Sequence, residues 1–297
     1  MIDLHMHSTF SDGTLTPTEL IRKGKEIGLT AMALTDHDTI EGVKEFIEAG
    51  KSIGVIPVPG VEISVDTKLP NHGHMHIVGL FIDPDSRELK NTLDYLRTQR
   101  NLRAEKIIRK LNDLGVEVSM EELLAEAGEG SIGRPHVAAI MVRKGLVSNI
   151  LEAFEKYLKK GGPAYVEKVK LGEKDAIQLI KKGGGIAILA HPHLMKYDTF
   201  EETKRKILEL KEYGLDGFEV YYSGMPLEYT RKLLEMADDY GFVYSGGSDF
   251  HGANKDDILL GYGKHDLEIP DLVYERLKGY WQVNGNKEIG GIGGMKE

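Results

Sequence analysis

The sequence contains no cysteine among its 297 residues. This excludes disulfide bonds and metal sites built from thiolates. It also has no apolar run near the ~20 residues that span a bilayer, and no basic segment followed by an apolar one, as in a signal peptide. We therefore expect a cytoplasmic protein with no cleaved leader and no membrane association.

The sequence also lacks an excess of positive charge: it has 38 Lys and Arg against 47 Asp and Glu, which gives a net charge of −9. A broad surface for nucleic acid, and for extended duplexes in particular, is not expected from this balance. A small phosphorylated ligand remains compatible, because bound divalent cations can supply positive charge locally. The length allows one barrel-sized domain or two smaller ones.

The first stretch of the chain, from Asp3 to Gly13, carries the clearest chemical pattern. Asp3, His5 and His7 alternate with apolar residues, which is the periodicity of a strand. Side chains two apart on a strand share one face, so the two imidazoles can bind one metal ion. The turn sequence after them, 11–13, contains Asp12 and returns a carboxylate to the same end.

Strand-like segments recur along the chain, and helical segments follow most of them. Such alternation predicts a parallel sheet, which closes into a barrel or stays open and doubly wound. We favour the barrel, because it brings the ends of distant strands to one mouth. The seven expected strands are 2–7, 31–35, 55–63, 74–82, 186–190, 217–221 and 242–249.

A charged helical stretch interrupts this alternation from about residue 88. Apolar residues at helical spacing predict helices over 88–114, 120–127, 133–144 and 148–159, and no strand before Tyr165-Val166. We expect a barrel formed by residues 1–87 and 166–284, a helical insertion over 88–165, and a mobile Gly-rich tail over 285–297. At the chain start, Thr16, Pro17 and Glu19 predict the capped beginning of a helix.

Histidines and carboxylates stand at or just beyond most of the expected strand ends. Oxygen and imidazole ligands suit Mn, Zn or Fe, and their number predicts two or three ions that share Glu62 or Asp249. Such a site activates water and favours hydrolysis, of phosphate esters above all. The nine candidate ligands are His5, His7, Asp12, His37, Glu62, His76, His191, Asp249 and His251.

Some polar residues near this set have more than one interpretation. His76 is preferred to His74 as a ligand, because it adjoins the apolar core of its strand; His74 and His72 are expected to be exposed. His193 is expected in a loop, although it is kept as a candidate for phosphate binding. Glu219 either supports a ligand or is a structural carboxylate.

The insertion carries a second feature, Ser131-Ile132-Gly133-Arg134-Pro135-His136. Arg134 and His136 at a helix start can direct donors at an anion, or form an ordinary capping turn with a surface arginine. Arg97, Arg100 and Arg103 share one helical face, which is either solvated or binds phosphate.

These motifs together resemble the PHP (polymerase and histidinol phosphatase) superfamily over nearly the whole chain. The motifs are His5-x-His7, 11–13, 35–38, 60–62, 76–79, 190–192 and Ser248-Asp249-x-His251. The resemblance implies a distorted seven-stranded (β/α)7 barrel with a trinuclear site of Mn, Zn or Fe.

The resemblance also implies how the ligands are shared among three ions. His5, His7, Glu62 and Asp249 hold the first ion. Glu62, His76 and His191 hold the second, and Asp12, His37 and His251 the third. Asp12 stands where many members of the superfamily carry histidine, which marks one branch.

The helical insertion resembles the branch of nucleoside 3′,5′-bisphosphate phosphatases, which includes 5′-to-3′ exoribonucleases acting on short 5′-phosphorylated RNA. In that branch the Arg and His at the positions of Arg134 and His136 bind substrate phosphate, and we keep Arg100 and His193 as further candidates.

We expect a phosphoesterase in which a metal-activated hydroxide, held by Glu62, Asp249 and His191, attacks phosphorus. The substrate is a phosphorylated nucleotide or a short RNA 5′ end. The alternatives are a histidinol-phosphate phosphatase, a nucleic-acid-associated nuclease, and a regulator that binds metal or nucleotide without catalysis.

Overall fold

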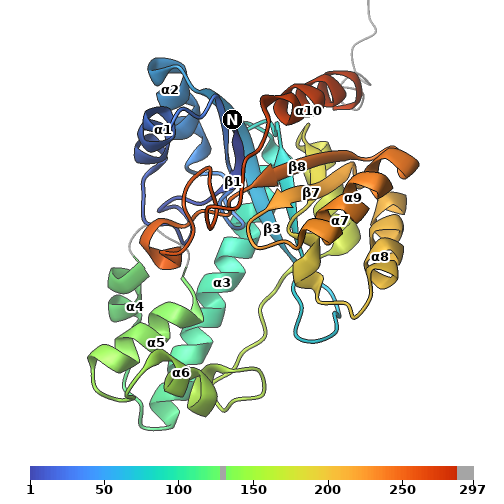
Figure 1. Ribbon diagram of the computed structural model, residues 1–297. Helices are drawn as coiled ribbons and strands as arrows, with labels where there is room; N and C mark the ends of the chain where they lie inside the picture. Colours follow the sequence, from blue (N-terminus) through green and yellow to red (C-terminus); the bar gives the residue numbers. More distant parts are fainter. Residues whose placement is uncertain (128–131, 286–297) are drawn as a thin grey trace, which may run out of the picture. The chain divides into compact units, whose positions relative to one another are not determined.

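The computed structural model describes residues 1–127 and 132–285 (Figure 1). Ser131 and the Gly-rich tail from residue 286 lie outside the described residues. The chain divides into two compact units, Met1–Thr92 with Leu171–Glu297, and Leu93–Lys170. Among the described residues, no helix has the length and apolar character needed to cross a membrane.

The first unit is a nearly closed, barrel-shaped sheet with helices on its outside. Its strands are β1 (Asp3–Met6), β2 (Ala31–Leu34), β3 (Ile56–Asp66), β4 (His76–Leu80), β5 (Leu171–Gly172), β6 (Ile186–Leu189), β7 (Gly217–Tyr222) and β8 (Val243–Gly247). Its helices are α1 (Pro17–Glu26), α2 (Val43–Ile53), α7 (Glu173–Lys182), α8 (Phe200–Glu212), α9 (Leu227–Tyr240) and α10 (Asp271–Asn284), with short 3-10 turns η2 (Pro192–Met195) and η3 (Gly252–Lys255).

Seven strands follow one another in the order β1-β2-β3-β4-β6-β7-β8, and the short β5 pairs beside β3. The residues that follow β8 then pair with the end of β1. The Asp249 amide donates to the His5 carbonyl at 2.9 Å, and the His7 amide donates to the Phe250 carbonyl at 2.9 Å. The expected seven-stranded barrel is therefore confirmed.

The expectation of an entirely parallel sheet is wrong, because β4 runs antiparallel to both of its neighbours, β3 and β6. This direction has a consequence for the site. His76 begins β4, so the reversed strand brings its first residue to the end of the sheet where the parallel strands finish. Within β4 and β3, His76 stands opposite Ser64, two residues beyond Glu62.

Two other boundaries differ from the expected ones. β3 does not end near Glu62 but continues to Asp66, because its second half changes partners from β2 to β4 and β5. Tyr165 and Val166 form no strand; the chain pairs again only at β5. The helix start at Thr16 is confirmed, since Thr16 and Glu19 form the reciprocal capping box and Pro17 begins the helix.

A fully buried apolar core joins the strands to α10, which packs beside β8. Packing of this kind stabilises the scaffold that fixes the strand ends. Its members include Ile2, Leu4, Ala33, Val58, Leu80, Ile188 and Leu277.

Gly247, the last residue of β8, makes a close approach to β1. A Cβ at this position would collide with the Cβ and backbone of His5. We expect Gly247→Ala to destabilise the protein by about 1–3 kcal/mol or more, because a packed barrel cannot widen locally without strain. Urea unfolding measures this loss.

Gly279 provides the matched control for that variant. It lies exposed in α10, and a Cβ there would meet no atom within 4 Å. Gly279→Ala should therefore leave stability unchanged or raise it slightly through helix propensity. Equal stability of the two variants would contradict the close packing of β8 on β1.

The second unit is helical and has its own apolar core. α3 (Arg87–Asp113) begins in the first unit and continues into the second. The other helices are α4 (Met120–Ala127), α5 (Arg134–Arg143), α6 (Ile150–Ala153) and a π-helical turn η1 (Phe154–Leu158). Two side chains of α3 bind the segment that follows η1. Arg103 Nε donates to the Val166 carbonyl and Lys110 Nζ to the Tyr165 carbonyl, both at 2.8 Å.

Candidate metal centre

The centre of the site is Glu62, whose side chain is fully buried between five imidazoles. Its Oε2 lies 3.4 Å from His5 Nε2, 3.3 Å from His7 Nε2 and 3.0 Å from His37 Nδ1. Its Oε1 lies 2.8 Å from His76 Nδ1 and 3.2 Å from His191 Nε2. One carboxylate therefore faces side chains from the ends of β1, β2, β4 and β6.

Asp249 closes the same cluster from the end of β8. Its Oδ1 lies 3.5 Å from His5 Nε2 and 3.2 Å from His7 Nε2. Its backbone has a φ of 58°, and His191 has a φ of 31°. Non-glycine residues adopt such values uncommonly, and the backbone at both positions turns sharply just after a strand.

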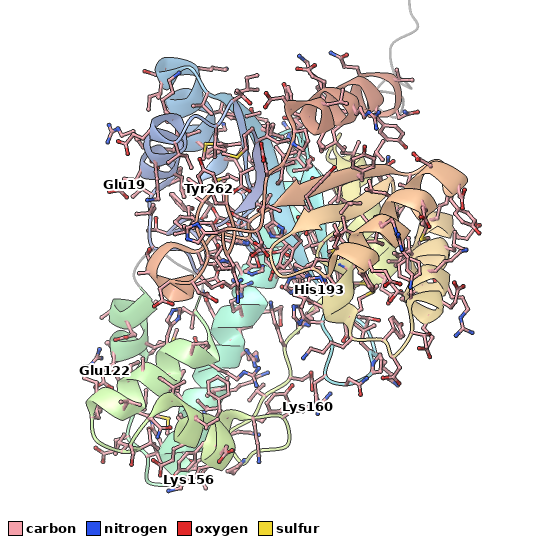
Figure 2. The ribbon with its side chains drawn as sticks, in the orientation of Figure 1. Glu19, Glu122, Lys156, Lys160, His193 and Tyr262 are labelled. Atoms are coloured by element: carbon pink, nitrogen blue, oxygen red, sulfur yellow. The ribbon has the colours of Figure 1, made fainter. Side chains whose placement is uncertain are left out.

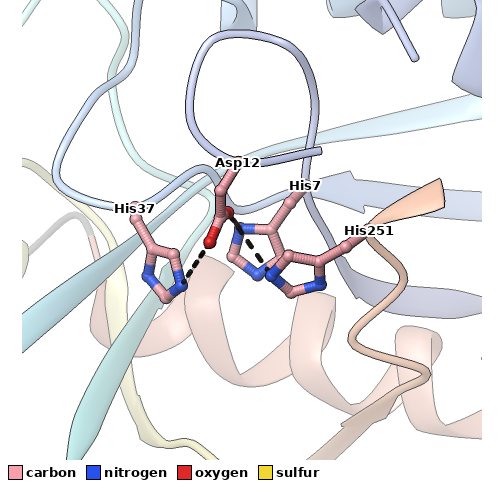
Figure 3. A group of neighbouring side chains, drawn as sticks. All are labelled: His7, Asp12, His37 and His251. Carbon is pink, nitrogen blue, oxygen red and sulfur yellow. Dashed lines mark ion pairs between the residues drawn. The ribbon is translucent and has the colours of Figure 1, made fainter. Parts of the chain in front are cut away.

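A third group surrounds Asp12, on the turn after β1 (Figure 3). Asp12 Oδ1 lies 3.4 Å from His251 Nε2, and Asp12 Oδ2 lies 3.9 Å from His37 Nε2. His7 also turns its Nδ1 toward Asp12, at 3.8 Å. His37 and His7 thus connect the Asp12 group with the Glu62 group through their two ring nitrogens.

Several ligand-type atoms in this centre are buried without a hydrogen-bond partner among the described residues. They are His5 Nε2, His7 Nε2, His37 Nδ1, Glu62 Oε2 and His191 Nδ1. Buried polar atoms are normally satisfied, so this concentration needs an explanation. A divalent ion with tetrahedral bonds of about 2.0–2.2 Å places its ligands roughly 3.3–3.6 Å apart. The separations of 3.2–3.5 Å between His5 or His7 and the carboxylates of Glu62 and Asp249 are close to that spacing, whereas the contacts of His76 and His37 with Glu62, at 2.8 and 3.0 Å, are shorter. The donor set, imidazole nitrogens and carboxylate oxygens, fits divalent ions.

Carboxylates and imidazoles lie next to one another in the centre and shift each other's pKa values. Burial alone would lower the pKa of His5 and His7. The carboxylates of Glu219, Glu62 and Asp249 raise the pKa of His5 well above its usual value, and the carboxylates of Asp249 and Glu62, 3.2 and 3.3 Å from His7 Nε2, raise the pKa of His7 to about 9. Protons on these rings therefore occupy the places where a cation fits, and a metal ion has to displace them.

The carboxylates shift in the opposite direction. Burial tends to raise the pKa of Glu62, but His76, His37 and His5 around it hold that pKa well below its usual range. Burial also opposes ionisation of Asp249 and Asp12, and neighbouring histidines lower the pKa of both. All three carboxylates are thus ionised at neutral pH, as metal ligands need to be.

Glu219, in the middle of β7, supports two of the histidines. Its Oε1 accepts from His5 Nδ1 at 2.7 Å, and its Oε2 accepts from the His191 backbone amide at 2.6 Å. A proton on His5 Nδ1 leaves Nε2 free to face Glu62 and Asp249. Of the two interpretations of Glu219, the geometry favours the one in which it orients a ligand.

The replacement Glu219→Gln tests that role. We expect the affinity for divalent metal to fall about 10- to 100-fold, the usual loss when a group that orients a ligand is changed. Competition with a chromophoric chelator measures it. Glu235→Gln, at an exposed position on α9, is the control. Unchanged metal affinity in Glu219→Gln would make Glu219 a structural carboxylate only.

Other buried carboxylates fix the segments that carry the candidate ligands, and sequence reasoning missed them. Asp3 accepts from the amide and hydroxyl of Ser248, beside Asp249. Asp36 does the same for Ser8, beside His7. Asp38 binds Ser64 in the same way, near Glu62.

The sequence did contain a signal for these carboxylates. Asp3 alternates with His5 and His7, and Asp36 and Asp38 flank His37. Tyr222 and Lys255, which both bind Asp249, were also missed, and no motif marks them.

The remaining candidates lie near the centre or in the second unit. His74 is exposed, as expected, although its ring lies 5.3 Å from the rings of His76 and His191. His193, labelled in Figure 2, lies in η2 with its ring 5.1 Å from that of Tyr222, and burial together with the neighbouring histidines lowers its pKa to about 4. It is therefore a neutral, half-buried imidazole and not an open loop side chain.

Within the second unit, Arg134 and His136 begin α5. Arg134 Nη1 donates to the Leu158 carbonyl at 2.9 Å, and its guanidinium lies over the rings of Phe154 and Tyr165. His136 Nδ1 accepts from the Gly133 amide at 3.2 Å, which caps the helix. Arg100 is almost fully buried on α3.

A nearly closed barrel with clustered imidazoles and carboxylates at its strand ends defines a protein with side-chain groups suited to binding divalent metal. The chain belongs to the PHP domain family, whose model matches residues 3–212. The resemblance stated from the sequence motifs is thereby confirmed.

Known proteins similar to this chain have related descriptions. It is 38% identical to a 5′-3′ exoribonuclease of Haemophilus influenzae, over 84% of this chain and 89% of that one. It is 36% identical to a 3′,5′-nucleoside bisphosphate phosphatase of Chromobacterium violaceum, over 91% and 93%. A candidate metal-dependent phosphoesterase from Bifidobacterium adolescentis has a similar structure, with a TM-score of 0.76, 28% identity and coverage of 93% and 94%.

Proposed function

We propose that this PHP-family phosphoester hydrolase removes phosphate from nucleotides such as nucleoside 3′,5′-bisphosphates, and acts on short 5′-phosphorylated RNA. The observation that carries the proposal is the set of buried, unpartnered ligand atoms around Glu62. The similar bisphosphate phosphatase and exoribonuclease support the substrate class.

The centre is proposed to hold two to three ions of Mn, Zn or Fe. His5, His7, Glu62 and Asp249 would hold the first. The second is assigned to Glu62, His76 and His191, and the third to Asp12, His37 and His251. When bound, such ions activate water and neutralise the charge that develops on a phosphoryl group.

The protein's own residues orient the groups around that chemistry. Glu219 fixes the ring of His5, and Asp3 fixes the segment before Asp249. For substrate phosphate we propose Arg134 and His136, with Arg100 and His193 as further candidates. This proposal assigns the helical insertion over 88–165 to substrate binding and the segments 1–87 and 166–284 to the barrel.

The test is phosphate release from adenosine 3′,5′-bisphosphate by the purified chain with Mn present. Histidinol phosphate, a 5′-phosphorylated RNA trinucleotide and a long DNA duplex as competitor complete the panel. We expect turnover of the bisphosphate and the trinucleotide, little turnover of histidinol phosphate, and no inhibition by the duplex.

Two results would change the proposal. Preference for histidinol phosphate would reassign the substrate while keeping the site. No turnover of any phosphomonoester, together with fewer than two ions per chain by elemental analysis, would indicate a regulator that binds metal or nucleotide without catalysis.

A further inference from the structure

Lys255 is a cation placed directly against a candidate metal ligand. It ends η3, four residues after His251, and its Nζ donates to Asp249 Oδ2 at 2.8 Å. The Tyr222 hydroxyl donates to the same oxygen, also at 2.8 Å. Asp249 Oδ2 therefore has two protein donors, while Oδ1 faces His5 and His7.

The segment of Lys255 is fixed to the turn that carries Asp12. Asn254 Nδ2 donates to the Asp12 carbonyl at 2.8 Å, and the Ala253 amide donates to Thr14 Oγ1 at 2.9 Å. The Thr14 amide donates to the His251 carbonyl at 3.2 Å. These bonds fix the segment that carries Lys255 between the turn of Asp12 and the side chain of Asp249.

The exposure of Lys255 differs from that of the ligands. Its side chain is 40% exposed, whereas that of Asp249 is 8% exposed. An ammonium group has three N–H donors, and Asp249 accepts from one of them. A second anion that arrives from solvent can therefore bind the same ammonium while the contact to Asp249 remains.

The Lys255 ammonium beside Asp249 should weaken metal binding, because it and the metal ion both interact with the negative charge of the same carboxylate. Tyr222 alone would orient Oδ2 without that cost. The presence of an additional, half-exposed charge is explained if the ammonium serves an anionic substrate as well as Asp249.

We propose that Lys255 binds the phosphoryl oxygens of the substrate at the metal centre. This inference rests on the proposed function, and it adds a phosphate contact to those assigned to Arg134 and His136. Lys255 would lie beside the reacting group and hold it against the centre, and its Asp249 contact would set its position.

The test compares Lys255→Met and Lys255→Arg with the wild type. Calorimetry measures binding of inorganic phosphate to the Mn-loaded protein, kinetics give KM for adenosine 3′,5′-bisphosphate, and elemental analysis gives bound Mn. We expect Lys255→Met to weaken phosphate binding and raise KM about tenfold or more, the loss of one charge-assisted hydrogen bond. Bound Mn should not fall, and Lys255→Arg should restore most of the phosphate affinity.

Lys264→Met is the matched control, because Lys264 forms an exposed ion pair with Asp257. It should behave as the wild type in all three measurements. Wild-type phosphate affinity in Lys255→Met would overturn the inference, and so would loss of Mn with unchanged phosphate affinity per loaded site. If the wild type hydrolyses no phosphomonoester, the proposed function fails, while phosphate calorimetry still decides the role of Lys255.

Discussion

Replacing Glu62 by Gln should abolish most activity and reduce bound metal, with the largest effect of any single substitution in the centre. Glu62 presents Oε2 to His5, His7 and His37, and Oε1 to His76 and His191. An amide nitrogen cannot ligate a cation in place of either oxygen. We expect turnover of adenosine 3′,5′-bisphosphate to fall at least about a thousandfold, or ~4 kcal/mol.

The same variant should bind metal more weakly at two positions, because one oxygen becomes an amide nitrogen and the other loses the negative charge of the carboxylate. Elemental analysis of the purified variant measures this directly. Circular dichroism should show an unchanged fold, since Gln has the shape of Glu. Glu48→Gln, at an exposed position on α2, is the control for a changed charge far from the centre. Full metal content and full activity in Glu62→Gln would show that Glu62 is not the shared ligand.

The candidate ligands could be named from the sequence because most of them belong to short local patterns, and their binding of metal stays a prediction. The alternation around His5 and His7 and the dipeptide Ser248-Asp249 are visible without any tertiary structure. The position of these residues at the ends of most strands favoured a closed barrel over an open sheet, because only closure brings those ends to one mouth. The convergence of side chains far apart in the chain is a consequence of that closure.

The direction of β4 could not be predicted in the same way. Its segment is apolar whichever way it runs, and only pairing with β3 and β6 decides the direction. The extent of β3 was missed for a related reason, since its second half exists by pairing with β4. Pairing is a property of two segments, and neither sequence alone contains it.

Tyr222 and Lys255 were beyond prediction because single polar side chains carry no period or motif. Tyr222 follows an ordinary strand pattern, and Lys255 stands in a polar turn. Their shared partner, Asp249 Oδ2, becomes available only when β7, β8 and η3 meet.

The metal-free protein, prepared with a chelator, should lose stability as the pH rises from about 6.5 to 9. The folded state raises the pKa of His7 to about 9, against burial, because the carboxylates of Asp249 and Glu62 lie beside its ring, and it also raises the pKa of His5. A raised pKa stabilises the fold below the unfolded value of about 6.5, and that stabilisation disappears as the pH passes the folded value. For His7 alone the loss is about 3 kcal/mol.

Stability should also fall below pH 6.5, for the opposite reason. Burial, partly opposed by Glu62, lowers the pKa of His76 to about 3, and burial together with nearby histidines lowers that of His193 to about 4. These rings are neutral in the folded protein and become protonated more easily in the unfolded chain. Their contribution to the free energy of unfolding is therefore present above pH 6.5 and decreases as the pH falls. Urea unfolding of the metal-free protein should therefore show a maximum near pH 6.5.

Metal binding should reverse the alkaline part of this profile. Ions need neutral imidazoles, so loading at pH 7.5 should release about two protons, from His5 and His7. Calorimetry in buffers of different ionisation enthalpy counts them, and the stability gained on adding Mn should increase from pH 6.5 to 8.5. The His7→Gln variant should release about one proton fewer when it binds metal, and the stability of its metal-free form should fall much less between pH 6.5 and 9. Metal binding without proton release would mean that the imidazoles are already neutral, and that Glu62 and Asp249 do not hold protons on them.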